Sequence, residues 1–343
     1  MAVNFSLMDN VTMEKISLLP NGFTLRPAQW PDLEPVTRLI YDVVAVDGDE
    51  VLAVTPDELR VEWETPGFDL ARDAWVVTAP DGRVVGFEEF NARDGHFSLQ
   101  GDGYVHPDFM GLGVGTALMR ALETRAREEI PLAEADLRVF IRNGMAMSEA
   151  DAIARQMHEN EGYKAVRYQW RMEIKLAEAP PEPVWPSGVE LRPFLADQHG
   201  PLVHEAEQEA FLDHWGSHPI PYESWSHRKL SREDFDPTLW HVAWAGNDIA
   251  GFSQCRWRQD MGWVSTLGVR RAWRKQGLGL ALLLQSFRDF QRRGTHTIGL
   301  GVDASNPPGA TRLYKKAGMT VAGEYVLYEK TLRPGRDLEE EEA

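Results

Sequence analysis

A basic, glycine-rich turn in the second half of the chain is the segment best suited to chemistry. Residues 270–279 read Arg-Arg-Ala-Trp-Arg-Lys-Gln-Gly-Leu-Gly, with a strand pattern before them and a helical pattern after them. A helix N-terminus has unpaired backbone N–H groups and a positive dipole, and glycine lets the backbone approach an anion closely. Arg270, Arg271, Arg274 and Lys275 add positive charge at the same place. The segment therefore predicts a site for a phosphorylated ligand.

Two common phosphate-binding patterns do not fit this turn. No Gly-Lys-Ser/Thr sequence follows it, so it is not a Walker loop. Leu282 stands where the dinucleotide-binding pattern requires its third glycine. A helix N-terminus that needs glycine only for close packing explains the same residues equally well. Taken alone, the turn leaves ligand binding and packing as equal alternatives.

A second segment, residues 302–319, bears on that choice. It contains Asn306, then a helical pattern that carries Tyr314, then Gly318 and a hydrophobic residue. With the pattern Val-x4-Arg-x2-Gly-x-Gly of residues 269–279, it resembles the acyl-CoA-binding turn and closing motif of the GNAT acyltransferase superfamily. The two motifs lie in the order and at the spacing of that family. The resemblance implies acetyl-CoA as co-substrate. No metal is expected, because Gly216 and Pro219 keep His214 and His218, four residues apart, out of a regular helix.

The resemblance also implies a role for each matching residue. Turn amides from Arg274 onward would hold the CoA pyrophosphate, Asn306 would contact the pantetheine arm, and Tyr314 would donate a proton to the departing thiolate. Backbone N–H groups of Leu267 and Val269 would polarise the thioester carbonyl. For Tyr314, simple core packing is the alternative. The predicted cofactor-binding set is Leu267, Val269, Arg274, Lys275, Gln276, Gly277, Leu278, Gly279 and Asn306.

The sequence does not identify the group that deprotonates the amine. Many members of the family carry a glutamate on the strand before the turn, but residues 263–269 contain no carboxylate. Water held by Ser265 or Thr266 is one alternative. A histidine or a carboxylate elsewhere is the other, and the candidates are His214, His218 and Asp260.

An aromatic, histidine-rich stretch at residues 211–227 matches the family segment that covers the acceptor site. Tryptophan and tyrosine offer a flat apolar wall with a polar end, which suits a ring-bearing or cationic acceptor. Trp215, Tyr222 and Trp225 are therefore predicted to bind substrate. A packed lid without substrate contact is an equal alternative.

The chain repeats itself, which predicts a duplicated domain. Gly-x-x-Leu-Arg-Pro occurs at residues 22–27 and again at 188–193. Each half reads as a strand, a helix, a hairpin, a strand entering the glycine turn and a long helix, and then a strand, a helix and a closing pair of strands. The fold class is α/β, with an α+β mixed sheet, and the resemblance implies that the two copies are tandem GNAT domains. Predicted boundaries are 20–176, a proline-rich linker at 177–186, 187–333, and an acidic tail at 334–343.

Periodicity gives approximate bounds for these elements. The predicted helices are 32–46, 116–129, 197–211 and 280–293, and the predicted strands are 74–79, 84–90, 240–245, 249–257 and 263–269. The first half keeps the glycines of its turn at 111–115 but lacks the other motif residues. Met110, His158 and Ala150 stand where the second half has Arg274, Tyr314 and Asn306. Catalysis is therefore predicted in the second half.

Composition excludes several classes of protein. With 53 acidic and 36 basic residues in 343, the formal charge is −17, which argues against a nucleic-acid partner. Residues 1–180 carry −14 of that charge, so the second half suits an anionic cofactor better. The single Cys255 permits neither an intrachain disulfide nor a cysteine zinc site. No apolar run approaches the ~20 residues needed to span a bilayer. These features predict a cytoplasmic monomer or homodimer with no membrane partner.

The sequence thus predicts an N-acetyltransferase that uses acetyl-CoA to acetylate a primary amine of a small molecule by direct attack in a ternary complex. One alternative is acetylation of a protein N-terminus or lysine. The alternative from another class is an acyl-CoA-binding sensor without catalysis.

Overall fold

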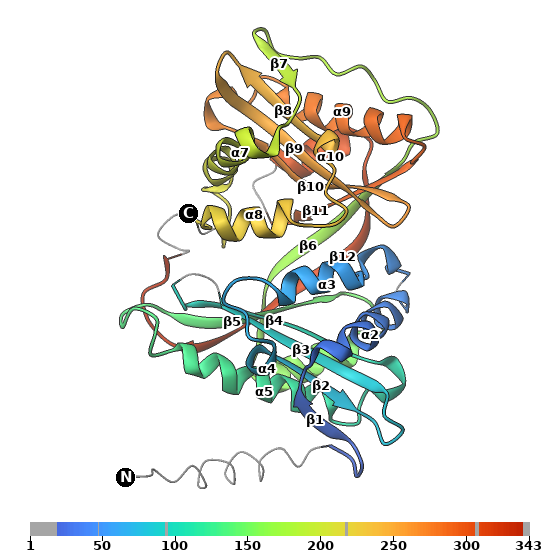
Figure 1. The fold of residues 1–343 in the computed structure, drawn as a ribbon, viewed down its shortest axis with the longest axis vertical. Coiled ribbons are helices and arrows are strands. Elements are labelled where there is room, and N and C mark those ends of the chain that lie inside the picture. Colours follow the sequence, from blue (N-terminus) through green and yellow to red (C-terminus); the bar gives the residue numbers. More distant parts are fainter. Residues whose placement is uncertain (1–18, 47, 93–94, 217–218, 306–308, 339–343) are drawn as a thin grey trace. The chain divides into compact units, whose positions relative to one another are not determined.

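The chain folds into two compact units (Figure 1). The first unit comprises residues 1–165 with 328–336, and the second comprises residues 166–327 with 337–343. The computed structural model describes residues 19–46, 48–92, 95–216, 219–305 and 309–338.

The first unit contains a mixed sheet with helices on both faces. Strands β1 to β4 are joined as antiparallel neighbours, β5 pairs parallel with β4, and the end of β12 follows β5. Val76 of β2 packs with α2, while the adjacent Val77 packs with α5, as the alternation of side chains along a strand requires. The elements are β1 Thr24–Pro27, α2 Leu33–Ala45, α3 Pro56–Trp63, α4 Leu70–Asp73, β2 Ala74–Thr78, β3 Val84–Ala92, β4 Ser98–Val105, α5 Val114–Glu129, β5 Val139–Ala146 and α6 Ala152–Asn160.

The second unit repeats this plan. Its strand order is β6-β11-β10-β9-β8-β7, in which β10 and β11 form the parallel pair. Val242 of β8 packs with α7 and α8, and the adjacent Ala243 packs with α9. The elements are β6 Lys164–Lys175, β7 Val189–Arg192, α7 Ala196–Phe211, α8 Tyr222–Leu230, β8 Trp240–Ala245, β9 Asp248–Arg258, β10 Met261–Val269, α9 Leu278–Arg292, β11 Thr297–Asp303, α10 Gly309–Lys316 and β12 Thr320–Arg333.

The end of each half differs from the sequence prediction. One long strand, β6 or β12, replaces the expected closing pair of strands. Residues 169–175 of β6 pair with β11 of the second unit, whereas residues 328–333 of β12 belong to the first unit. The two halves have therefore exchanged their closing strands. The boundaries 20–176 and 187–333 remain a prediction about the duplicated segments of sequence.

Candidate functional site

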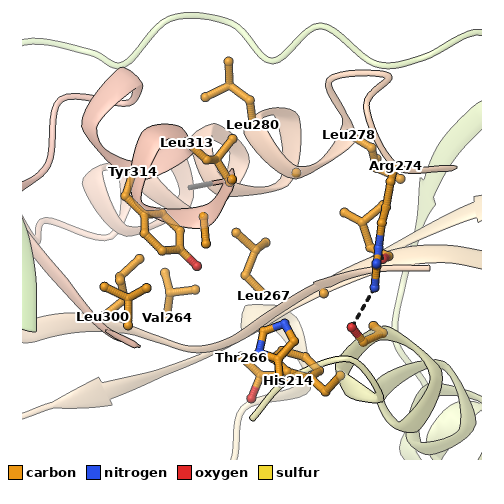
Figure 2. A pocket seen from close by; sticks show the side chains of 18 of the residues that line it. His214, Val264, Thr266, Leu267, Arg274, Leu278, Leu280, Leu300, Leu313 and Tyr314 are labelled. Carbon is orange, nitrogen blue, oxygen red and sulfur yellow. Dashed lines mark hydrogen bonds between the residues drawn. The ribbon is translucent and has the colours of Figure 1, made fainter. Parts of the chain in front are cut away.

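A cavity of about 750 Å³ lies in the second unit, at the point where two neighbouring strands separate (Figure 2). β10 and β11 pair in parallel only at Gly262 with Ile298 and at Trp263 with Gly299. Beyond that point, residues 264–269 and 300–303 line the two sides of the opening. The separation frees one backbone edge of β10, which can pair with an extended ligand.

The turn before α9 forms one end of this cavity. Gly277 caps the helix with φ of +87°, in the left-handed region that side chains disfavour. The next residues, Leu278 and Gly279, begin α9 and line the cavity. Their N–H groups have no acceptor within the helix, so they can bind an anion. The sequence prediction of an anion site at this turn is compatible with this geometry.

The arginines of the turn were expected to add charge for a phosphorylated ligand. In the structure they form ion pairs and hydrogen bonds within the protein. Arg270 pairs with Glu209 at 2.5 Å, and Arg271 pairs with Asp213. Arg274 donates to Val269 O at 3.1 Å and to Ala210 O at 2.9 Å, and it lies 3.2 Å from Asp213. These side chains tie the turn to α7 and to Asp213 in the turn that follows it, so much of their charge is already compensated.

This geometry predicts that Arg274 acts by holding the turn in place. Arg274→Ala and Arg274→Lys should both weaken acetyl-CoA binding about 10-fold, because lysine cannot reproduce the planar fork that contacts two carbonyls and a carboxylate. Calorimetric titration measures the affinity of each variant, and Arg292→Lys, on an exposed part of α9, is the matched control. Wild-type affinity in Arg274→Lys would instead assign the effect to charge alone.

Tyr314 brings a proton donor to the same cavity. Its ring, on α10, is 8% exposed, and its hydroxyl points into the cavity beside Val264 (Figure 2). Burial raises the pKa of Tyr314 to about 12. The phenol therefore stays protonated across the neutral range and can donate a hydrogen bond.

Most of the predicted cofactor residues line this one cavity. Gln276 is not among the described lining residues, and its side chain donates to Ala272 O at 3.2 Å. Asn306 lies outside the described residues. The predicted residues that line the cavity are Leu267, Val269, Arg274, Lys275, Gly277, Leu278, Gly279 and Tyr314.

Of the candidate side chains that the structure describes, His214 lines the cavity, and so do Ser265 and Thr266, which were predicted to hold a water. The His214 ring lies near Thr266 and Leu267 (Figure 2). Burial, with a smaller effect of Arg274, lowers the pKa of His214, so the neutral imidazole dominates at neutral pH. Asp260 lies in the turn between β9 and β10 and is not among the lining residues. His218 lies outside the described residues.

The structure shows a polar network at the cavity wall that was not predicted from the sequence. The Lys229 ammonium donates to Gln254 Oε1 at 2.7 Å and to Thr266 Oγ1 at 2.8 Å. The Glu207 carboxylate accepts from Gln254 Nε2 at 2.6 Å and from Trp225 Nε1 at 3.0 Å. Burial lowers the pKa of Lys229, against the opposing effect of Glu207. Since Glu207 and Thr266 line the cavity, this network fixes polar groups where β10 bulges between Val264 and Thr266.

The aromatic residues predicted to bind substrate are not among the described residues that line the cavity. Trp225 is buried between α7, α8 and the sheet, with Tyr222 stacked on it at 5.8 Å between ring centroids. Trp215 packs against the guanidinium of Arg167 at 4.9 Å. Their part in acceptor binding remains a prediction. Within the described residues, no group of three or more His, Cys, Asp or Glu side chains is arranged to hold a metal ion, and no helix is long and apolar enough to cross a membrane.

Comparison with known proteins bears on what this cavity does. The model of the acetyltransferase (GNAT) family matches residues 41–146 and 201–319. The mycothiol acetyltransferase of Pseudarthrobacter chlorophenolicus is 31% identical over 270 residues, which cover 76% of this chain and 75% of that protein. A GCN5-related N-acetyltransferase from Sphaerobacter thermophilus has a similar structure, with a TM-score of 0.77, 36% identity, and coverage of 94% of this chain and 99% of that one. A tandem GNAT protein of the clavulanic acid biosynthesis pathway shares the fold, with a TM-score of 0.68, 16% identity, and coverage of 92% and 100%.

Proposed function

The chain belongs to the acetyltransferase (GNAT) family, and on this premise we propose that its second unit transfers the acetyl group of acetyl-CoA to a primary amine of a small molecule. One observation carries the proposal. The buried hydroxyl of Tyr314 and the N-terminus of α9 belong to the same cavity, which opens where β10 leaves β11. The cavity therefore joins an anion-binding end to a proton donor.

The reaction needs few protein groups. As the amine attacks the thioester carbonyl, a C–N bond forms and the C–S bond breaks; the amine loses a proton and the sulfur gains one. We assign donation of the second proton to Tyr314. Backbone N–H groups of Leu267 and Val269 polarise the carbonyl, and the amides at the start of α9 hold the pyrophosphate. Holding both reactants in one cavity supplies the proximity effect.

We assign removal of the amine proton to His214, because it lies in the cavity and is neutral at neutral pH. Its lowered pKa predicts that kcat, measured with both substrates saturating, falls as the pH drops below the pKa of His214, under the usual 6.5. His214→Gln should lower kcat by about 10²-fold or more and remove this acid limb. A pH–rate profile measures both effects. His296→Gln, in the loop before β11, is the control, and an acid limb that persists in His214→Gln would exclude the assignment.

Two observations support a small acceptor. The first is that several relatives are named mycothiol acetyltransferase. The second is that α7, β10, β11 and α10 bound the cavity on several sides. The test is acetylation of a panel of small primary amines and amine-ended peptides, read by mass spectrometry. The acceptor of the mycothiol acetyltransferases belongs in that panel. Acetylation of small amines supports the proposal; modification of peptides alone would favour a protein acetyltransferase, and acetyl-CoA binding without any transfer would favour a sensor.

A further inference from the structure

A second cavity, of about 280 Å³, lies in the first unit. There β4 and β5 pair in parallel only from Ser98 with Phe140 to Gly101 with Asn143, and then they separate. The cavity is the counterpart of the one in the second unit, because it lies between the same pair of strands and the turn before the long helix. Its chemistry differs.

The described lining of the cavity in the first unit offers no positively charged side chain to hold a phosphate. Met110 stands where the second unit has Arg274, and no lysine or arginine is among the described residues that line it. Four methionines are among the residues that line it, and their flexible thioether side chains adapt to apolar ligands of varied shape. These four, the wall methionines, are Met110, Met119, Met145 and Met157.

A buried carboxyl group faces this wall. Glu88 of β3 lines the cavity and is 4% exposed, and its Oε1 has no hydrogen-bond partner among the described residues. Gly101 and Gly103 of β4 make room for it, since a Cβ on either would come within 3.0 Å of the Glu88 carboxyl. At the corresponding place of the second unit, Ser253 satisfies its hydroxyl with Ser286 at 2.8 Å. A buried carboxyl without a partner is costly, so it indicates a ligand that supplies one.

Two further buried acceptors line the same cavity. His158 is 6% exposed, and its Nδ1 lies 2.9 Å from Ala154 O. Because a carbonyl only accepts, Nδ1 carries the proton and Nε2 presents a lone pair, which has no partner. Asn143 is 5% exposed, and its Oδ1 is likewise without a partner. When Glu88 is ionised, all three unsatisfied atoms accept hydrogen bonds. Burial together with the charges of Asp102 and Glu89 raises the pKa of Glu88 well above its usual range, and a cation bound beside it would favour the ionised form.

We propose that the cavity of the first unit binds an organic primary ammonium ion, with its charge at Glu88 and its apolar body on the methionine wall. An ammonium group has three N–H donors and no acceptor, which complements Glu88 Oε1, His158 Nε2 and Asn143 Oδ1 in chemical type. The positive charge compensates the buried carboxylate. This site is separate from the transfer site of the second unit and does not depend on the acetyltransferase proposal.

The test uses the full chain with 13C-labelled methionine methyl groups, titrated with n-hexylammonium chloride and with 1-hexanol as its neutral match. We expect saturable shifts of the four wall methionines, at least 10-fold weaker binding of hexanol, and no shift of Met172 and Met319, which lie in the core of the second unit. Glu88→Gln should weaken n-hexylammonium binding at least 10-fold. Glu128→Gln, on an exposed part of α5 and not among the lining residues, should leave it unchanged.

Three results would overturn the proposal. Equal binding of hexanol and n-hexylammonium would show that the cavity binds the apolar chain and does not recognise the positive charge. Unchanged binding in Glu88→Gln would remove the carboxyl from the site. Shifts of the wall methionines by acetyl-CoA, with displacement of n-hexylammonium, would make the cavity a second cofactor site. None of these readouts depends on turnover, so they are independent of whether the second unit acetylates an amine.

Discussion

Replacing Tyr314 with phenylalanine should lower kcat by about 10²-fold or more while leaving the affinity for acetyl-CoA unchanged. The ring remains to pack against its neighbours, but the hydroxyl that points into the cavity is lost, so the thiolate must leave without a protein donor. Stopped-flow detection of free CoA thiol measures the rate, and calorimetry measures the affinity. Tyr168→Phe is the matched control, since Tyr168 is 47% exposed in the same unit.

A different outcome would change the interpretation of Tyr314. If Tyr314→Phe turned over at the wild-type rate, the hydroxyl would have no part in proton donation and Tyr314 would be a core residue. If affinity for acetyl-CoA fell together with the rate, the phenol would act in binding. Only loss of turnover with retained binding agrees with the proposed role.

Gly277→Val should raise the dissociation constant of acetyl-CoA about 10-fold or more. At φ of +87° a β-branched residue is strained, and left-handed backbone costs a side-chain-bearing residue about 1–2 kcal/mol. Relief of that strain moves the turn and the first amides of α9, which line the cavity and would hold the pyrophosphate. Calorimetric titration measures the change.

The chain offers a close control for strain alone. Gly294, just after α9, has φ of +93° and open space around its Cβ position, as Gly277 has. Gly294→Val should lose similar stability in thermal unfolding but bind acetyl-CoA like the wild type. Equal affinities in the two variants would show that the turn does not hold the cofactor.

The secondary structure was largely predictable from the sequence. The helix predicted at 280–293 is α9, Leu278–Arg292, and its predicted apolar stripe of Leu283, Phe287 and Phe290 is fully buried. The hairpin predicted from strands 240–245 and 249–257 forms as β8 and β9. These elements are local: periodicity sets the buried face, and glycine or asparagine sets the turn.

The features that could not be predicted from the sequence are those that depend on partners distant along the chain. The charge of Arg274 is visible in the sequence, but its bonds to Ala210 of α7 and to Asp213, which follows α7 and lies 61 residues away in sequence, are not. The network of Lys229 joins α7, α8, β9 and β10, and no local pattern marks it. The exchange of β6 and β12 is equally hidden, because a long strand has the same periodicity whichever sheet it joins. Tyr314 and the glycine turn could be proposed as site residues because their spacing matched a family pattern.

The central claim is that the cavity of the second unit holds acetyl-CoA for reaction, and a crystal structure of the full chain with bound acetyl-CoA tests it most directly. The account predicts the pyrophosphate at the amides of residues 277–279, the pantetheine arm along the free edge of β10, and the thioester sulfur within hydrogen-bond distance of Tyr314 Oη. Acetyl-CoA bound elsewhere on the chain, with the cavity between β10 and β11 empty, would contradict it.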